Sequence, residues 1–207
     1  MPEAPVPEAV TGIILAGGRA SRLGGIDKAA LKIGQQTVLD RVLAALAEVA
    51  GQFLAIVNDD RLNADSRLTI IHDPEPHAGV LPALLASLEA ATTPLAVLVA
   101  CDMPFLDGRL LRHQVALAAD ADVVIPVVDG REEPMHAVYR VASCREAIRA
   151  ALARQQRRMI AFLDDVRTYR LEEAALRQID PELRSFFNVN TPEDLEAARR
   201  LAAQQSR

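Results

Sequence analysis

The chain has 207 residues, of which 50% are hydrophobic, and its formal net charge is −5 at pH 7. A chain of this length can bury a full core as one domain, and its acidic balance argues against nucleic acid or an anionic membrane as the main partner. No apolar stretch approaches the roughly 20 residues of a membrane helix, and its two cysteines, without a CxxC or a histidine cluster, offer no zinc site and fit a reducing cytoplasm.

The chain begins with a segment rich in proline and acidic residues, which predicts a disordered lead-in over residues 1–9 and a single domain over residues 10–207. The apolar run Thr11–Ala16 follows and predicts a buried strand. The loop after this strand reads LAGGRASRLGGIDK from Leu15 to Lys28. Glycines let a backbone approach a ligand closely, and successive N–H groups in such a turn form an anion site. With Arg22 and Lys28 beside it, the loop is expected to hold a polyphosphate.

Two common phosphate-binding motifs do not account for this loop. A P-loop needs a serine or threonine directly after its lysine, whereas Lys28 precedes Ala29. A Rossmann fingerprint needs G-x-G-x-x-G, whereas these glycines come as the pairs Gly17–Gly18 and Gly24–Gly25. The alternative to a phosphate site is a surface turn that happens to be rich in glycine.

Farther along, short apolar runs alternate with amphipathic segments. This order predicts an α/β fold of three layers (α/β/α), with a mostly parallel, Rossmann-like sheet between helices on both faces. The later expected strands are Phe53–Val57, Leu68–Ile71, Leu95–Ala100 and Val123–Val128. The expected helices are Thr37–Ala50 with a Thr37–Asp40 capping box, Leu81–Ala91, a helix from an Asp107 cap to about Ala118, Ser143–Arg154 and Glu193–Ala203.

Polar residues follow several of these strands. Ligands of parallel sheets bind at the carboxyl ends of the strands, so Gly17, Asn58, Asp73 and Asp102 are expected to share one rim. Asp102 is a candidate ligand for Mg²⁺, which prefers oxygen ligands and would neutralise charge built up on a phosphate. Capping the turn before Pro104 is the alternative role of its carboxylate.

Asn188 and Asn190 precede the last helix, for which Thr191 is the expected N-cap and Asp194 completes a capping box. From sequence alone, the two asparagines could make polar contacts with a ligand or simply turn the chain. The four histidines, His72, His77, His113 and His136, are expected to be packing or surface residues.

The glycine loop resembles the signature of the nucleotidyltransferases related to molybdenum cofactor guanylyltransferase, the MobA family. That signature has the form L-A-G-G-x-S-x-R-M-G-G-x-D-K. The chain differs in having Leu23 for the methionine and in placing Ser21 one position later. The likeness extends over nearly the whole chain through later motifs: Cys101-Asp102-x-Pro104, Pro134 to Tyr139, Arg157-Arg158 and Asn188-x-Asn190.

The resemblance implies the fold of nucleotide-diphospho-sugar transferases, with an antiparallel strand around Pro134–Tyr139 at the far side of the sheet. It implies an enzyme that transfers GMP from GTP to molybdopterin or its molybdenum form and releases pyrophosphate, with Mg²⁺ as cofactor. Cofactor-biosynthesis proteins and molybdoenzyme apoproteins are its further expected partners.

Residue roles follow by correspondence with the family. Lys28 and the Gly17 and Gly18 amides would hold the triphosphate, Arg22 would stabilise the departing pyrophosphate, and Asp102 would bind Mg²⁺. Base and ribose would contact Leu15, Ala16, Asn58 and Asp73, and Asn188 and Asn190 would lie at the second substrate. The paired Arg157 and Arg158 are hypothesised to bind the phosphate of the pterin, because arginine forks match phosphate, and solvated charge after a helix is the alternative.

One loop departs from the family pattern. Where the family has G-P-L-A-G beside the base, this chain reads GVLPA from Gly79 to Ala83. LAGG and Asp27-Lys28 favour GTP, since the cytidylyl relatives tend to have LAAG and lack the aspartate. Transfer of a cytidylyl group, transfer to another phosphorylated acceptor, and a nucleotide-binding protein without catalysis are the alternatives.

Overall fold

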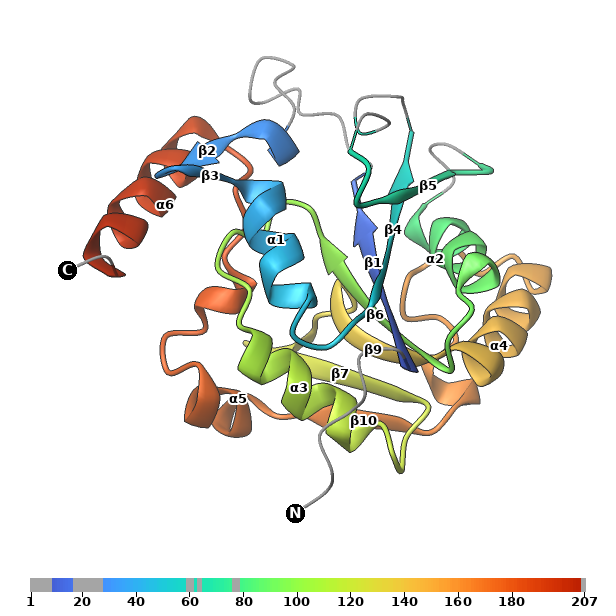
Figure 1. Cartoon of the computed structure of the whole chain (residues 1–207). Helices are drawn as coiled ribbons and strands as arrows, with labels where there is room; N and C mark the ends of the chain where they lie inside the picture. The colour runs from blue at the N-terminus through green and yellow to red at the C-terminus, as the bar shows by residue number, and fades with distance from the viewer. Residues whose placement is uncertain (1–8, 17–27, 59–61, 63–64, 76–78, 206–207) are drawn as a thin grey trace.

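The computed structural model describes residues 9–16, 28–58, 62, 65–75 and 79–205 (Figure 1). Within them a central sheet has the strand order β10-β7-β9-β6-β1-β4-β5, and β8 pairs with β7 beside this path. Its strands are β1 (Val10–Leu15), β4 (Gln52–Val57), β5 (Thr69–His72), β6 (Leu95–Ala100), β7 (Val123–Val128), β8 (Arg131–Glu132), β9 (His136–Arg140) and β10 (Thr168–Leu171). A separate hairpin consists of β2 (Lys32–Ile33) and β3 (Gln36–Thr37).

The described helices are α1 (Val38–Leu46), α2 (Val80–Ala90), α3 (Gly108–Leu117), α4 (Val141–Ala153), α5 (Glu173–Ile179) and α6 (Pro192–Gln205). Each expected strand and helix is present, with ends that differ by a few residues. The Thr37–Asp40 capping box is formed on both sides, and Asp107 caps α3 by accepting from the Arg109 amide. The expected lead-in, residues 1–9, lies outside the described residues except for Ala9.

Most strands of the sheet run in one direction. β1 is parallel to both β4 and β6, and β5 is parallel to β4. The expected antiparallel strand is β9, but its position was wrong: it lies inside the sheet, between β6 and β7, rather than at the far side. The reason is burial, since Val138 and Tyr139 point to opposite faces and both are fully buried. A strand that is apolar on both faces needs a neighbour on each side and a helix layer above and below.

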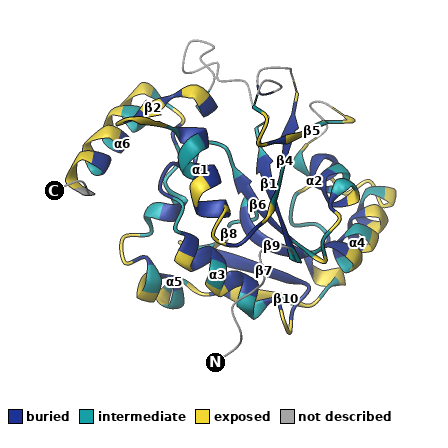
Figure 2. Ribbon diagram, in the orientation of Figure 1, coloured by how far each residue is buried: buried dark blue, intermediate teal, exposed yellow. Residues whose placement is uncertain are grey.

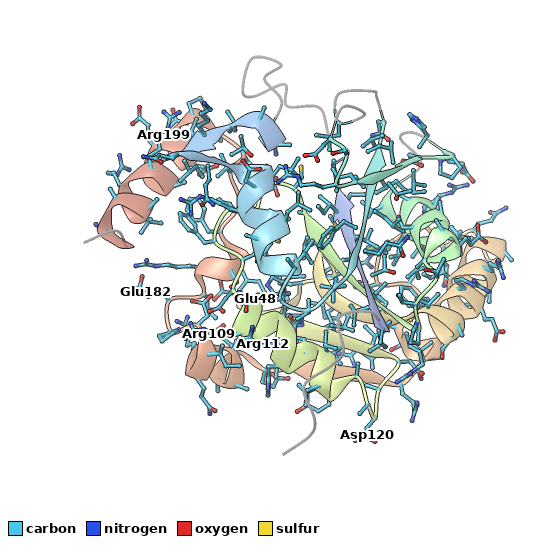
Figure 3. The ribbon with its side chains drawn as sticks, in the orientation of Figure 1. Glu48, Arg109, Arg112, Asp120, Glu182 and Arg199 are labelled. Carbon is cyan, nitrogen blue, oxygen red and sulfur yellow. The ribbon has the colours of Figure 1, made fainter. Side chains whose placement is uncertain are left out.

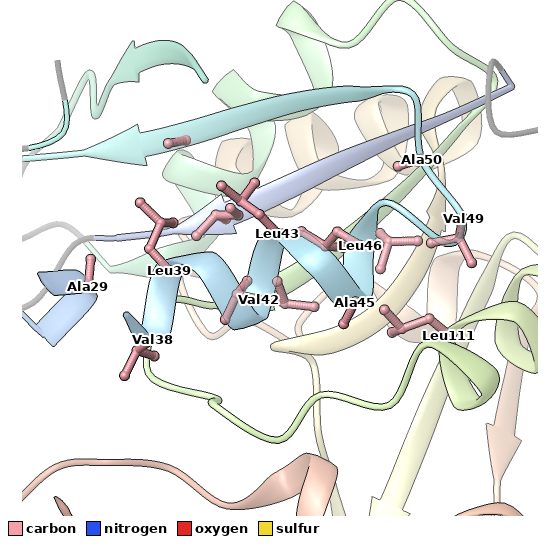
Figure 4. Close-up of a cluster of buried hydrophobic side chains, with 14 of the residues drawn as sticks. Ala29, Val38, Leu39, Val42, Leu43, Ala45, Leu46, Val49, Ala50 and Leu111 are labelled. Carbon is pink, nitrogen blue, oxygen red and sulfur yellow. The ribbon is translucent and has the colours of Figure 1, made fainter. Parts of the chain in front are cut away.

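Two layers of helices cover the two faces of the sheet. Successive side chains of each strand point to opposite faces, so they pack against the two helix layers in turn. In β1, Ile13 packs with α2 and α4, whereas Ile14 packs with α1 and α3. The strands are buried and the yellow, exposed residues lie on the outer sides of the helices in Figure 2. Figure 4 shows the side chains of α1 packed together with Leu111 from α3. The three-layer arrangement expected from the sequence is confirmed.

Charged pairs on the surface hold neighbouring elements of a layer together. Arg112 of α3 forms an ion pair with Glu48, which follows α1 (Figure 3). The carboxyl group of Glu48 lies so close to Gly108 that a Cβ there would overlap it, at 2.2 Å from Cδ. The Glu48 carboxyl group thus lies against the start of α3. In the part of the chain that the structure describes, no helix is long and apolar enough to cross a membrane.

Candidate active site

The polar residues expected at one rim of the sheet follow neighbouring strands. The backbone pairing continues just past the strand ends: Ala16 N donates to Ile56 O at 3.0 Å and Asp73 N to Val57 O at 2.9 Å. Asp102 follows β6 in the same way, because Cys101 N donates to Leu15 O at 3.1 Å. Leu15, Ala16, Asn58, Asp73 and Asp102 therefore lie along one edge, whereas the expected site residues Gly17, Gly18 and Arg22 lie outside the described residues.

The centre of this edge is a contact among three side chains from distant parts of the chain. Lys28 Nζ donates to Asp102 Oδ2 at 2.9 Å and to Asn190 Oδ1 at 2.6 Å. The Lys28 and Asp102 side chains keep only 19% and 15% of their surface exposed. Lys28 begins a short 3₁₀ turn that is anchored by the buried side chain of Ala29. The glycine loop thus ends with its cation held against the carboxylate that follows β6.

Asn190 reaches this centre because the segment before α6 is fixed at two points. Val189 is fully buried, and its amide donates to Asp102 O at 2.9 Å. Asp194 Oδ2 accepts from the amides of both Asn190 and Thr191 at 2.9 Å. These bonds, led by the one from the Asn190 amide, lower the pKa of the Asp194 carboxyl group. The expected Thr191–Asp194 capping box is present, and the same carboxylate also positions Asn190.

The other residues expected at the second substrate make contacts different from those of Asn190. Asn188 Nδ2 donates to Phe186 O at 3.1 Å, which is a local turn contact. Arg157 Nη1 donates to Glu75 Oε2 at 2.8 Å, in the loop after β5. Its neighbour Arg158 is exposed. The four residues were grouped together from the sequence, but the structure divides them between two sides of the sheet.

The division follows from packing. Phe187, ahead of Asn190, packs with the core under α1 and α3, and its ring meets that of Phe105 edge-on at 5.8 Å. Met159 and Ile160, after Arg157, pack with the core under α2 and α4. Arg157 therefore cannot be assigned to the Asn190 side from its position.

The unusual loop Gly79–Ala83 fits the structure without strain. Gly79 is the N-cap of α2 and has a φ of 104°, a backbone conformation that favours glycine. Pro82 is the third residue of α2, where its missing N–H costs nothing because the first four helical amides have no partner within the helix. Ala83 is buried in α2. The displaced proline thus becomes part of the first helical turn.

His136 illustrates a residue of chemical interest that serves packing. Its ring is fully buried and lies tilted against the Phe186 ring, with 4.6 Å between centroids. Neither ring nitrogen has a hydrogen-bond partner, and burial lowers the pKa of His136 to about 4. The ring is therefore neutral at pH 7, in accord with the expected packing role.

The donor set suits a divalent cation that also binds phosphate. Among the described residues, no group of three or more His, Cys, Asp or Glu side chains could hold a metal alone. Yet Asp102 and Asn190 present two oxygens to one ammonium group, so this position favours a positive charge. Mg²⁺ typically binds through one or two carboxylates and completes its shell with water and substrate phosphates. Asp102 fits that pattern.

Comparison with known proteins agrees with this geometry. Residues 12–168 match the model of the MobA-like NTP transferase domain. A molybdenum cofactor guanylyltransferase of Desulfosudis oleivorans is 34% identical over 192 residues, which span 92% of this chain and 95% of the relative. A probable molybdenum cofactor guanylyltransferase of Pelotomaculum thermopropionicum is also 34% identical and covers 93% of each chain.

Solved structures share the fold. The molybdopterin-guanine dinucleotide biosynthesis protein A of Archaeoglobus fulgidus superposes with a TM-score of 0.77 at 26% identity, over 94% of this chain and 99% of that one. A 2-C-methyl-D-erythritol 4-phosphate cytidylyltransferase of Thermus thermophilus gives a TM-score of 0.68 at 19% identity, over 92% and 98% of the two chains, and so shares the fold alone. With its family match, its relatives and its rim of site residues, the chain belongs to the MobA-like NTP transferase family.

Proposed function

We propose that the chain transfers GMP from GTP to the terminal phosphate of molybdopterin or its molybdenum form, giving the guanine dinucleotide cofactor and pyrophosphate. The observation that carries this proposal is the meeting of Lys28, Asp102 and Asn190 at the carboxyl edge of β1 and β6. Curated relatives with this activity in their names match over nine-tenths of the chain.

Each of the three side chains has a defined task in this reaction. Lys28 is the last residue of the glycine loop and would bind the triphosphate of GTP. Asn190 would contact the acceptor, since its segment approaches the centre from the side of α1 and α6. Asp102 would hold Mg²⁺, which supplies charge neutralisation at the phosphate under attack when it is bound.

The chain needs no general base for this chemistry. The attacking group is a phosphate that is already anionic near pH 7, so deprotonation is not a barrier. The protein contributes by aligning the two phosphates and by placing positive charge beside them.

The test is to incubate the purified chain with molybdopterin, Mg²⁺ and GTP, CTP or ATP in separate reactions, and to quantify pyrophosphate and the dinucleotide product. We expect product with GTP and at least a hundred-fold less with CTP or ATP. Product from CTP alone would replace the guanylyl assignment. Tight binding of GTP without turnover of any acceptor would instead support a protein that binds nucleotides and presents the cofactor.

A further inference from the structure

Arg157 contacts the loop after β5, whereas Asn190 contacts Lys28 near the end of β6. Helix α4 ends at Ala153, and Gln155 adopts a φ of 60°, so the chain reverses before Arg157. The segment then packs through the fully buried Phe162 between α2 and α4. The segment after α4 is held by this packing, and from it the guanidinium group of Arg157 reaches Glu75 in the loop after β5.

That loop carries Asp73, which belongs to the rim described above. Glu75 connects the two: its carboxylate accepts from Arg157 Nη1 at 2.8 Å, and its amide donates to Asp73 Oδ1 at 3.0 Å. The Asp73 amide in turn donates to Val57 O at the end of β4. A short series of hydrogen bonds thus leads from Arg157 to the strand edge.

The backbone near Arg157 also meets the start of α2. A Cβ on Gly79 would lie 3.4 Å from the Arg157 carbonyl oxygen, which is ordinary contact distance, so the two backbones are neighbours. Three segments converge here: the loop after β5, the first residue before α2, and the segment after α4. Asn190 and Lys28 belong to the other set of contacts, at the end of β6.

We infer that Arg157 is a positioning residue for the nucleotide: through Glu75 it fixes the turn that carries Asp73, and it does not bind the acceptor. This inference rests on the proposed function. The guanidinium group of Arg157 is directed to Glu75, in the loop after β5, and Lys28, Asp102 and Asn190 make their contact at the end of β6. Arg157 thus acts on GTP binding by ordering the Asp73 turn before the nucleotide arrives, and an ordered turn costs less to bind.

The test compares Arg157→Gln and Glu75→Gln with the control Arg154→Gln. Arg154 is the C-cap residue of α4, three positions before Arg157, and has its own exposed ion pair, with Asp165 rather than Glu75. Calorimetry gives the Kd of GTP for each protein, and steady-state kinetics give the KM values of GTP and of the acceptor. An exposed ion pair changes affinities modestly, so we expect both the Kd and the KM of GTP to rise about three- to five-fold in Arg157→Gln and Glu75→Gln.

The acceptor KM should stay within two-fold in these variants, and Arg154→Gln should leave the Kd of GTP unchanged. The exchanged pair, Arg157→Glu with Glu75→Arg, should bind GTP more tightly than either single reversal. A rise in the acceptor KM alone, or an exchanged pair no better than its single reversals, would overturn the inference. Failure of the wild-type chain to transfer GMP while it still binds GTP would refute the proposed function, and the calorimetric comparison would still decide the role of Arg157.

Discussion

Asp102→Asn separates catalysis from stability at the candidate site. In the folded chain the Asp102 carboxylate lies 2.9 Å from Lys28 Nζ, and both side chains are largely buried. The amide has the same shape and can still accept from Lys28, so we expect the free energy of unfolding to fall by only about 1 kcal/mol. The variant should therefore fold, and the Val189 amide should still donate to the backbone carbonyl oxygen of residue 102.

Asp102→Asn should lower the rate of GMP transfer far more than it lowers stability. Loss of one preorganised charge at a reacting phosphate typically lowers kcat by about 10²–10³, or about 3–4 kcal/mol in the activation barrier. We expect a loss of this size in GMP transfer, measured as pyrophosphate released per enzyme at saturating GTP. The Mg²⁺ dependence of GTP binding, measured by calorimetry, should weaken in parallel.

Asp107→Asn is the matched control. Asp107 is also a largely buried aspartate in the segment after β6, is paired with Arg109, and caps α3. Asparagine caps a helix about as well as aspartate does, so this variant should keep both its stability and its kcat. Wild-type turnover by Asp102→Asn, or an equal loss of activity in Asp107→Asn, would refute the assignment of Asp102 to the reacting phosphate.

Three further predictions concern the framework. Thr37→Ala removes the N-cap of α1 and should lower the free energy of unfolding in urea by about 1 kcal/mol without changing kcat. Gly12→Ala places a Cβ 3.0 Å from Phe53 Cδ1, so it should destabilise by about 1–3 kcal/mol, and an unchanged urea midpoint would contradict this packing. The hydrogen bond from Arg167 lowers the pKa of Asp122. The stabilisation from this carboxylate should be complete above the ordinary carboxyl pKa of about 3.9 and should be lost as the pH falls through the lower folded pKa. The free energy of unfolding in urea should therefore fall below about pH 5, and Asp122→Asn should reduce this dependence on pH.

The strands of the sheet were predictable where their burial produces a continuous run of apolar residues. Strands inside a parallel sheet are covered on both faces, so they read as continuous apolar runs, as Leu95–Ala100 does. The capping pair Thr37–Asp40 and the cap at Asp107 were likewise visible, because their partners are two or three residues away.

Elements without an apolar run or a clear periodic pattern were not predicted. β10 reads TYRL and exposes 46% of Tyr169, so no apolar run announces it. β2 and β3 have two residues each, too few for any periodicity. α5, with one buried residue in seven, shows little amphipathic pattern.

Contacts across the candidate site were less predictable still. Lys28 and Asn190 are 162 positions apart, and Arg157 and Glu75 are 82 apart. Local propensity carries no information about such pairs, since each depends on how whole layers of the fold pack together. Resemblance to a family indicated Asn190 as a site residue, but neither the resemblance nor the local sequence indicated that Arg157 contacts Glu75.

The position of β9 has a consequence for how the chain assembles. β6 is complete at Ala100, yet β9, its neighbour on the side away from β1, begins only at His136. Until that segment has been synthesised, the growing chain presents β6 as an open edge of apolar residues, and β7 has no strand to join it to the rest of the sheet. Open, apolar edges recruit strands from other chains. Aggregation is therefore most favoured while synthesis is between β7 and β9. A chain truncated before His136 lacks the strand that joins β6 to β7.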